Sequence, residues 1–416
     1  MADDVKKRVL WLHTQPEHYH NCMMDALEEA GQRAGDMEYI AAFSQAGSRG
    51  EAGGALSTEV PVPQVAQTVF LRMKEGRRGG GAKPGFWGGI HDNWREDLYP
   101  LKYDIVIVAG YGSRTFREVI ADCHKRGIPV AMFSDSNMKS QLGGGFKEWA
   151  KRTLKRQMLK KIIAQTDVML TANRLGVEYW KFYGAAAEKV VVCPYYADYR
   201  RVETASRTNR EEVLTKLGLR KEDRLILSAA RLVPAKGLDL MIRAFLASGL
   251  GAKGYRYVIA GVGPLEEELK ALCGKGEGGE LGKTILFAGF RQPSEVLALM
   301  HHADVFVLPS VYEPHGIVVQ ESLAAGTPVI ASDVAGAAYD LVEPGINGEI
   351  FRSGDWQNLQ KKLEAVLADA AKLASMREAS REKFEAWHAE FSPITVVERV
   401  MRELLGKSWK TQERCR

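Results

Sequence analysis

The chain of 416 residues is 45% apolar and 26% charged, a composition typical of a globular protein. Its length exceeds that of one typical domain and suits two domains of Rossmann size, each with its own core. A formal net charge of +5 is mild for this length and does not indicate nucleic-acid binding, and the five scattered cysteines lack the spacing of metal ligands. We expect these cysteines to be reduced thiols in a cytoplasmic protein.

The N-terminal segment, residues 1–8, lacks the apolar stretch of a signal peptide. No apolar run in the chain approaches the roughly 20 residues that a membrane-spanning helix requires. We therefore expect a cytoplasmic protein that meets a membrane, if at all, only from the inner face and at its surface.

Apolar runs and helical periodicity alternate along the first half of the chain, which predicts a parallel sheet with right-handed crossovers. Strands are expected over residues 9–12, 104–109, 129–133, 167–171 and 189–193, and helices over residues 21–34, 116–126, 146–165 and 176–183. Glycine-rich segments at 47–54 and 76–85 bracket a short apolar run at 65–73, and this region is predicted to form loops.

Residues 205–224 are polar and separate two regions in which predicted strands and helices alternate in a similar way. We therefore place the domain boundary here, with domains at 1–200 and 201–389. The second half predicts strands over residues 225–228, 257–260, 284–287, 305–309, 328–331 and 348–351, and helices over residues 238–246, 265–272 and 394–405. The expected fold class is α/β, with two Rossmann-like domains.

Two acids, Glu313 and Glu321, flank the start of a predicted helix at Gly316. A helix start offers backbone N–H groups and the positive end of the helix dipole to an anion. At about 1.5 Å per residue, Glu321 lies a turn and a half into the helix while Glu313 stays on the loop. The staggered acids suit two hydroxyl-bearing parts of one ligand. The alternative is one acid near a helix dipole and one solvated acid, with no ligand.

Arg231 and Lys236 follow the first strand of the second domain, where ligand contacts are expected in an open α/β sheet. Two cations in this loop can hold a diphosphate, because the Arg guanidinium can donate to two of its oxygens at once and the Lys ammonium acts as a point charge. An ordinary charged loop is the alternative. The glycine turn Gly261–Pro264 follows the next strand and is explained equally well by a tight turn. It matches neither the GxGxxG sequence of dinucleotide-binding proteins nor a phosphate-binding GxxxxGK[ST] sequence.

These motifs occur in the order Arg231…Lys236-Gly237, Gly261-Val-Gly-Pro264, Gly289-Phe290 and Glu313-Pro-His-Gly-Ile-Val-Val-Gln-Glu-Ser-Leu-Ala-Ala-Gly-Thr-Pro-Val-Ile330. Together they resemble a retaining GT-B glycosyltransferase of the GT4 family, or glycosyltransferase group 1. The resemblance is strong over residues 190–352. Elsewhere the chain shares only the alternation of predicted strands and helices. It implies two Rossmann-like domains that face each other across a cleft. The C-terminal residues, about 390–416, would pack back on the first domain.

The resemblance also implies a role for each matching residue. Arg231 and Lys236 would bind the diphosphate of a UDP- or GDP-sugar, Glu321 its ribose and Glu313 the hydroxyls of its sugar. The remaining donor contacts would be Gly263, Phe290, Arg291, His315, Gly316, Ile317 and Val318. Such an enzyme, a hexosyltransferase, retains the anomeric configuration and has no obligatory metal or other cofactor. The departing phosphate oxygen would help to deprotonate the acceptor, and catalysis would rest on electrostatic stabilisation and orientation.

Three positions depart from the pattern of this family. His315 stands where an aromatic residue, commonly Phe, is usual, so it either alters the sugar contact or carries a proton-sensitive hydrogen bond. The loop after the first strand lacks the common Gly-Gly pair, and its His18 and His20 either face the acceptor or lie in a plain surface loop. The histidine that often follows a later strand is absent, so Asp135 or its neighbours would replace it as a catalytic residue.

Lysines and arginines crowd the predicted helix at 146–165, namely Lys147, Lys151, Arg152, Lys155, Arg156, Lys160 and Lys161. One interpretation is that segment 147–161 docks on anionic lipid, as a lipid-linked acceptor would need. The other is a solvated helix face. The acceptor is accordingly expected to be a sugar, a glycan or a lipid-linked molecule.

Other functions fit the same scaffold: a sugar-nucleotide epimerase, a phosphorylase, or a non-catalytic protein that binds sugar nucleotides. Release of nucleoside diphosphate only in the presence of an acceptor excludes the first two, and turnover excludes the third. The sequence leaves open the donor base, the sugar and the acceptor.

Overall fold

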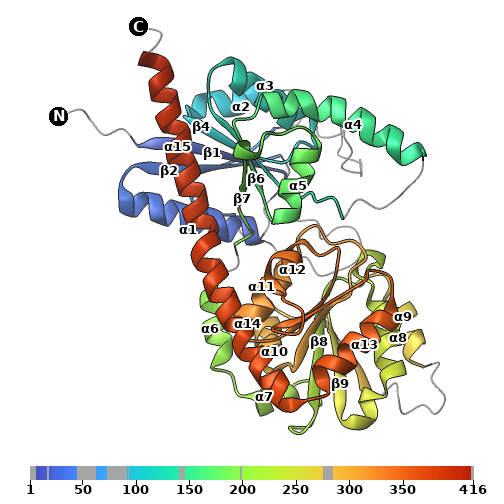
Figure 1. The fold of residues 1–416 in the computed structure, drawn as a ribbon. Coiled ribbons are helices and arrows are strands. Elements are labelled where there is room, and N and C mark those ends of the chain that lie inside the picture. The colour runs from blue at the N-terminus through green and yellow to red at the C-terminus, as the bar shows by residue number, and fades with distance from the viewer. Residues whose placement is uncertain are drawn as a thin grey trace.

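The structure, a computed structural model, describes residues 6–15, 18–44, 62–72, 91, 93–139, 146–196, 199–274 and 284–413. It contains two parallel β-sheets with helices on both faces, one above the other in Figure 1. We call the part built on the N-terminal sheet the first domain and the part built on the other sheet the second domain. The glycine-rich segments at 47–54 and 76–85 lie outside the described residues.

The first sheet has the strand order β3-β2-β1-β4-β5-β6-β7. Its strands are β1 (Lys7–His13), β2 (Met37–Phe43), β3 (Gln67–Phe70), β4 (Ile105–Ala109), β5 (Val130–Ser134), β6 (Val168–Thr171) and β7 (Val190–Val192). The helices of this domain are α1 (His18–Ala34), α2 (Trp94–Leu98), α3 (Arg114–Lys125), α4 (Phe146–Ala164) and α5 (Arg174–Phe182), with 3-10 turns η2 (Tyr99–Leu101) and η3 (Ala187–Lys189).

Both faces of the first sheet are buried, which explains why its central strands are continuous apolar runs. In β1, Leu10 and Leu12 point into one core cluster, while Val9 and Trp11 point into another on the opposite face. All four side chains are inaccessible to solvent. Alternate residues of one strand thus hold helices on both sides of the sheet.

The second sheet has the strand order β10-β9-β8-β11-β12-β13. Its strands are β8 (Arg224–Ala229), β9 (Tyr255–Ala260), β10 (Ile285–Gly289), β11 (Val305–Leu308), β12 (Val329–Ser332) and β13 (Gly348–Phe351). The helices of this domain are α6 (Tyr199–Ser206), α7 (Arg210–Thr215), α8 (Leu238–Ser248), α9 (Glu266–Cys273), α10 (Pro293–His302), α11 (Ile317–Ala324), α12 (Gly336–Leu341), α13 (Trp356–Leu367) and α14 (Ala370–Phe391), with 3-10 turns η4 (Pro234–Lys236) and η5 (Leu250–Lys253). The C-terminal helix α15 (Pro393–Glu413) follows α14.

The two C-terminal helices belong to different domains. Phe384 and Trp387 of α14 lie in a core cluster of the second domain. Val397 and Met401 of α15 lie instead in the core cluster that contains Trp11 of β1. In Figure 1, α15 runs from the second domain past α1 to the far side of the first. The chain therefore crosses twice between the domains.

Two strands were not predicted from the sequence. Residues 37–43 form β2, and the run at 65–73, predicted as loop, contains the edge strand β3. Phe43 of β2 pairs with Phe70 of β3 in parallel register. The hydrogen bonds of this ladder come from a neighbouring strand, so a short and partly exposed strand such as β3 gives little local signal. The C-terminal helix is also longer than the predicted 394–405.

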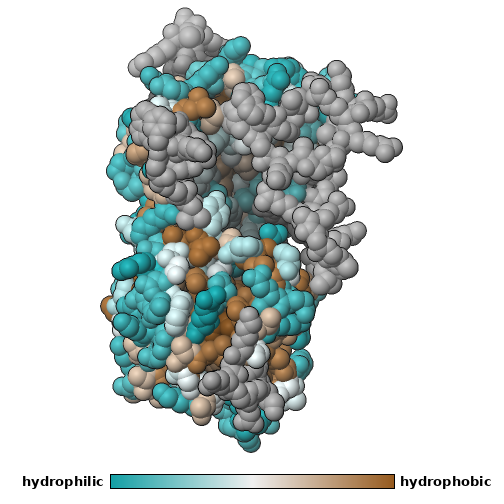
Figure 2. All heavy atoms as spheres, turned by 90° about the vertical axis from the view of Figure 1, so that its right-hand side faces the viewer, coloured by the Kyte–Doolittle hydropathy of each residue, from teal (hydrophilic) through white to brown (hydrophobic). Residues whose placement is uncertain are grey.

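On the face of the molecule in Figure 2, apolar residues are interspersed among polar ones over the second domain. Among the helices that the structure describes, none is both long and apolar enough to cross a membrane.

Candidate functional site

The central contact of the site joins two motifs that lie 77 residues apart in the chain. The Lys236 Nζ atom is 2.6 Å from Glu313 Oε2, and the Ser310 hydroxyl donates to the same oxygen at 3.2 Å. Glu313 is 7% exposed, so its carboxylate is held by these two donors in a largely dry environment. The cation and the acid therefore form one site.

Backbone contacts hold together the loops that carry this pair. The carbonyl oxygen of Ala235, in η4, accepts from the backbone N–H groups of Val311 at 2.9 Å and Tyr312 at 3.2 Å. Gly237 follows with a positive φ of 58°, and a Cβ atom there would lie 2.2 Å from the Pro309 carbonyl oxygen. Only glycine fits this close approach, which fixes the distance between the two loops.

The glycine turn after β9 supports the loop that carries Arg231. A Cβ atom on Gly263 would lie 2.4 Å from the Leu232 carbonyl oxygen, and one on Gly261 would lie 1.9 Å from the Ala230 carbonyl oxygen. The Leu232 N–H group donates to the Val262 carbonyl at 3.0 Å. The turn thus packs backbone against backbone beneath Arg231, whose side chain is exposed. This contact explains the glycines without any ligand.

Helix α11 begins beside Glu313. Gly316 is its N-cap residue with a left-handed φ of 85°, and Ile317 and Val318 form the first turn. The first N–H groups of a helix have no partner within the helix, so this turn can donate to an anion.

Glu321 lies farther along α11 and contacts the first domain. The Tyr19 hydroxyl of α1 donates a hydrogen bond to its carboxylate. Burial raises the pKa of Glu321 to about 7, against the smaller lowering effect of this bond. Glu313 and Glu321 therefore have different partners, as their staggered spacing predicts.

His315 is buried where the second domain meets the first. Its Nε2 atom is 2.9 Å from the Gln320 side-chain amide, and its ring centroid is 5.1 Å from that of Tyr195. Its Nδ1 atom is 3.4 Å from the side-chain amide of Asn173, in the first domain. Burial lowers the pKa of His315 to about 3, so the ring is neutral. The residue that departs from the family pattern thus lies between the domains.

Phe290 and Arg291 follow β10 at the carboxyl edge of the second sheet, the edge formed by the C-terminal ends of the strands. Phe290 is 38% exposed. The Arg291 Nε atom donates to the Ala288 carbonyl at 3.0 Å, and its guanidinium lies 3.6 Å from Glu295. The Gly261 N–H group donates to the Gly289 carbonyl at 2.8 Å, which joins this loop to the glycine turn.

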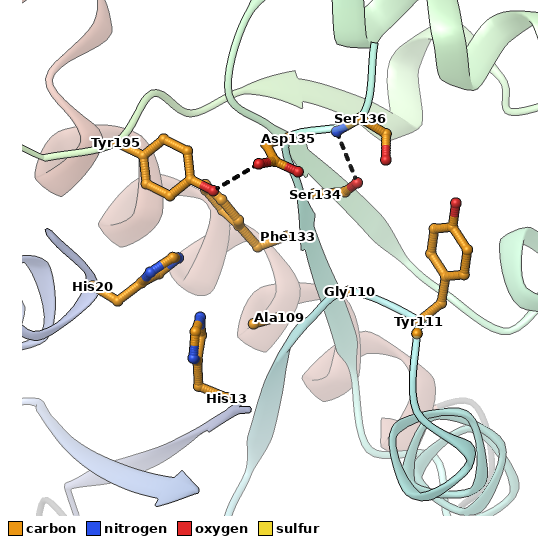
Figure 3. Close-up of a pocket in the computed structure, with 11 residues that line it drawn as sticks. His13, His20, Ala109, Gly110, Tyr111, Phe133, Ser134, Asp135, Ser136 and Tyr195 are labelled. Atoms are coloured by element: carbon orange, nitrogen blue, oxygen red, sulfur yellow. Dashed lines mark hydrogen bonds between the residues drawn. The ribbon is translucent and has the colours of Figure 1, made fainter. Parts of the chain in front are cut away.

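The carboxyl edge of the first sheet carries an open cavity of about 320 Å³. Its lining comes from the ends of β1, β4 and β5, from the start of α1 and from the segment after β7, namely His13, His20, Ala109, Gly110, Tyr111, Gly112, Phe133, Ser134, Asp135, Ser136 and Tyr195. In Figure 3, the rings of His13 and His20 face each other on one side of the cavity and Tyr111 lies on the other. An edge of this kind is where open α/β sheets bind ligands.

Polar and ring contacts order this cavity. The Tyr195 hydroxyl donates to Asp135 Oδ2 at 3.3 Å. The ring centroid of His20 is 4.2 Å from that of His13 and 5.1 Å from that of Tyr195. The His13 Nδ1 atom lies 2.8 Å from the Gln15 carbonyl oxygen, the geometry of a donated hydrogen bond.

Two of the residues singled out in the sequence of the first domain, Asp135 and His20, line this cavity. His18 begins α1, and its side chain lies outside the described part of the structure. The sequence did not predict a role for His13, Tyr111 or Tyr195. A usable signal existed for His13, since it is the last residue of the first strand.

The pKa of the Tyr312 hydroxyl is raised first by burial and then by the carboxylates of Asp135, in the first domain, and Glu313, in the second. Within the described residues, no group of three or more His, Cys, Asp and Glu side chains is arranged to hold a metal ion.

Comparison with known proteins agrees with this geometry. Residues 209–383 match the family model described as glycosyl transferases group 1. The match falls within the second domain. An uncharacterized glycosyltransferase of Methanocaldococcus jannaschii is 30% identical over 196 residues, which are 46% of this chain and 48% of the relative.

A second relative is named as a GDP-mannose-dependent phosphatidylinositol monomannoside mannosyltransferase of Corynebacterium glutamicum. It is 26% identical over 245 residues, which are 57% of this chain and 62% of the relative. The chain thus spans about half to three fifths of the length of these relatives of the group 1 domain.

The structure of Anabaena HepE in complex with UDP resembles the whole chain. It has a TM-score of 0.67 at 15% identity and covers 96% of this chain and 100% of its own. At this identity the likeness establishes the fold alone. It confirms the predicted fold class, α/β with the two Rossmann-like domains of the GT-B architecture.

Proposed function

We propose that this group 1 protein is a retaining glycosyltransferase of the GT4 type, which moves a hexose from a UDP- or GDP-sugar to an acceptor hydroxyl. The observation that carries the proposal is the contact of Lys236 with buried Glu313 beside the start of α11. A cation and a carboxylate held together offer one group to a diphosphate and one to sugar hydroxyls. The UDP bound by Anabaena HepE and the GDP-mannose named for the Corynebacterium relative support a nucleotide-sugar donor.

On this proposal, the carboxyl edge of the second sheet binds the donor. Arg231 and Lys236 hold the diphosphate, and Glu313 accepts hydrogen bonds from the sugar. The first turn of α11, Gly316 to Val318, donates backbone N–H groups to the same region. Glu321 accepts from the ribose, and Phe290 and Arg291 flank the base. Gly263 acts by supporting the loop of Arg231.

The cavity of the first domain receives the acceptor. The bond from sugar C1 to the phosphate oxygen breaks, and the acceptor oxygen bonds to C1 from the same face. The acceptor proton passes to the departing phosphate oxygen, so charge develops on the diphosphate beside Arg231 and Lys236. Asp135, held by Tyr195, orients the reacting hydroxyl, and His20 lines the acceptor side. The reaction requires no metal or other cofactor.

Helix α4 supports a peripheral membrane contact in the cytoplasm. Arg156, Lys160 and Lys161 are exposed, and Leu154, on the same helix, is 75% exposed. Exposed cations and an exposed apolar side chain on one helix suit an anionic lipid surface. Flotation with phosphatidylserine vesicles tests this contact, and replacing Lys160 and Lys161 by Glu should abolish it.

A thermal-shift screen against UDP, GDP, ADP and their sugars tests the function. A ligand that binds only the native state raises the melting temperature by mass action. The nucleotide sugar that binds is then incubated with and without candidate sugar, glycan and lipid-linked acceptors. Acceptor-dependent release of nucleoside diphosphate supports the proposal and excludes an epimerase or a phosphorylase. Absence of stabilisation by every nucleotide would contradict it.

A further inference from the structure

The carbonyl group of Pro314, between Glu313 and His315, is held by the first domain. The side-chain amide of Asn137, after β5, donates to this oxygen at 2.7 Å, and the amide of Asn173 donates at 3.0 Å. Both asparagines are 1% exposed. We call these two hydrogen bonds the Pro314 contact. They join the domains at the loop that carries the Lys236–Glu313 pair.

Asn173 is fixed in place by its second role. Its Oδ1 atom accepts from the Gly176 N–H group at 3.0 Å and so caps the N-terminus of α5. Because one side-chain oxygen caps the helix, the amide nitrogen is directed at Pro314 without a further loss of side-chain freedom. The position of α5 therefore sets the position of the donor to the second domain.

The residues around the Pro314 contact are closely packed. A Cβ atom on Gly336, the first residue of α12, would lie 2.3 Å from the Asn173 amide nitrogen and 2.4 Å from the Pro314 oxygen. The next carbonyl, that of His315, accepts from the Ala337 N–H group at 2.7 Å. Any larger residue at position 336 would push the asparagine away from the carbonyl. The contact is thus close-packed on the side of the second domain.

The location of the contact gives it a consequence for the site. The Pro314 peptide directly follows Glu313 and comes two residues before Gly316, where α11 begins. Without its two donors, the buried Pro314 carbonyl would still be removed from water but would form no compensating hydrogen bond. The loop therefore adopts this orientation most readily when both asparagine amides are present. Both amides belong to the first domain, and they reach Pro314 only while the domains are together.

We propose that Asn137 and Asn173 are positioning residues that order the loop from Glu313 to Gly316 only when the two domains close, so that closure and assembly of the donor site are one event. Neither asparagine touches the reacting atoms. The consequence for catalysis depends on the function proposed above, whereas the coupling between closure and loop order does not.

The test uses the full chain with Asn137→Ala and Asn173→Asp combined. Aspartate keeps an oxygen for the cap of α5 but replaces the amide donor by an oxygen that repels the Pro314 carbonyl. Asn209→Asp is the matched control, because the Asn209 oxygen caps α7 through the N–H groups of Glu211 at 2.8 Å and Glu212 at 3.2 Å, within its own helix. Asn173→Ser replaces the aspartate variant if the latter does not fold, since serine also caps helices.

Two measurements are made on each protein without nucleotide. Small-angle X-ray scattering gives the radius of gyration, and hydrogen exchange with mass spectrometry gives the protection of the peptide covering residues 309–320. The double variant should show a larger radius of gyration. Exchange in this peptide should be at least about tenfold faster, because one to two buried hydrogen bonds are lost. The control should match the wild type in both.

Turnover of the nucleotide sugar found by the donor screen should fall by about 10- to 100-fold in kcat, because the assembled state becomes rare. Unchanged radius and unchanged loop exchange in a folded double variant would overturn the inference, as would a larger radius with full loop protection. If the wild type turns over no nucleotide sugar, the proposed function fails, and scattering and exchange still decide whether closure orders the loop.

Discussion

The carboxyl edges of the two sheets carry different chemistry. The edge of the second sheet presents ionisable side chains, with Arg231, Lys236 and Glu313 on loops whose backbones are in direct contact and Glu321 on α11. The edge of the first sheet presents imidazole and phenol rings, and among the described residues lining its cavity the charged carboxylate is Asp135 and none is Lys or Arg. One edge suits a dianionic diphosphate and the other a neutral, hydroxyl-bearing molecule.

The difference also concerns how each edge is assembled. At the second edge, glycines and backbone contacts within the domain fix the loops around Gly237 and Gly263, whereas the Pro314 carbonyl is held by the first domain. The first edge relies on ring packing, in which Tyr195 contacts His20 of the first domain and His315 of the second. An edge held by backbone contacts and an edge lined by rings should therefore respond differently to mutation and pH.

The largest effect is expected at Lys236, on the charged edge. Lys236→Ala should lower transfer by about 10²- to 10³-fold, the usual consequence of removing one preorganised group that stabilises transition-state charge. Release of nucleoside diphosphate from the active nucleotide sugar measures this. Lys216→Ala, at the exposed end of α7, is the matched control. Full turnover by a folded Lys236→Ala variant would contradict the proposed role of Lys236 in the site.

A smaller effect is expected at Asp135, on the aromatic edge. Asp135→Asn should lower kcat by about 10²-fold, because the acceptor hydroxyl loses its ionised partner. Nucleotide affinity, measured by calorimetry, should stay within twofold. Tyr195→Phe, which removes only the hydroxyl bound to Asp135, should have a weaker effect in the same direction. A parallel loss of nucleotide affinity would show that the two edges do not divide donor from acceptor.

His315, between the edges, predicts a pH dependence of stability. Burial lowers its folded-state pKa from an ordinary 6.5 to about 3, so its contribution is fully present above pH 6.5 and is lost as the pH falls toward 3. Between pH 8 and pH 5, the wild type should lose about 2 kcal/mol of unfolding free energy more than His315→Phe does.

Urea unfolding followed by tryptophan fluorescence at the two pH values measures this difference. The exposed His124, near the end of α3, gives the control variant His124→Gln, which should follow the wild type. Equal pH dependence in the wild type and His315→Phe would mean that the ring is accessible to protons in the folded state.

The smallest effect is expected at Glu321, whose pKa burial raises to about 7. Only the ionised carboxylate accepts from both ribose hydroxyls, so affinity should fall as the pH drops through 7. From pH 6 to pH 8 the ionised fraction rises about tenfold, and affinity for the nucleotide sugar should follow. Calorimetry with Glu321→Gln should give a flat profile, and exposed Glu268→Gln should behave as the wild type. A sloping profile in Glu321→Gln would assign the titration to another group.

Most of the fold could be predicted from the sequence because its strands are buried on both faces. Runs such as that of β4 are apolar throughout and stand out between helices of amphipathic period. The strand β2 was missed although it is also apolar, and β3 was missed because its stability comes from pairing with β2. The expected roles of Arg231, Lys236 and Glu313 lie in short linear motifs, which is why residue order alone pointed to them.

The edge of the first sheet could not be predicted in the same way. His13 ends β1, Tyr111 follows β4 and Tyr195 follows β7, so the three residues come from separate segments of the chain. Their position around one cavity depends on the sheet order β1-β4-β5-β6-β7, which brings the C-terminal ends of these strands to one edge. No spacing pattern in the sequence indicates that these residues line one cavity.

The sequence by itself determined the chemistry of the charged edge, since glycines and charged residues at fixed spacing dictate local loop geometry. Only the tertiary structure decided what faces that edge. Asn137 and Asn173 read as ordinary loop and cap residues, yet both donate to the Pro314 carbonyl beside Glu313. The physical reason is that a hydrogen bond between domains depends on the relative position of two separately folded sheets, which no local pattern specifies.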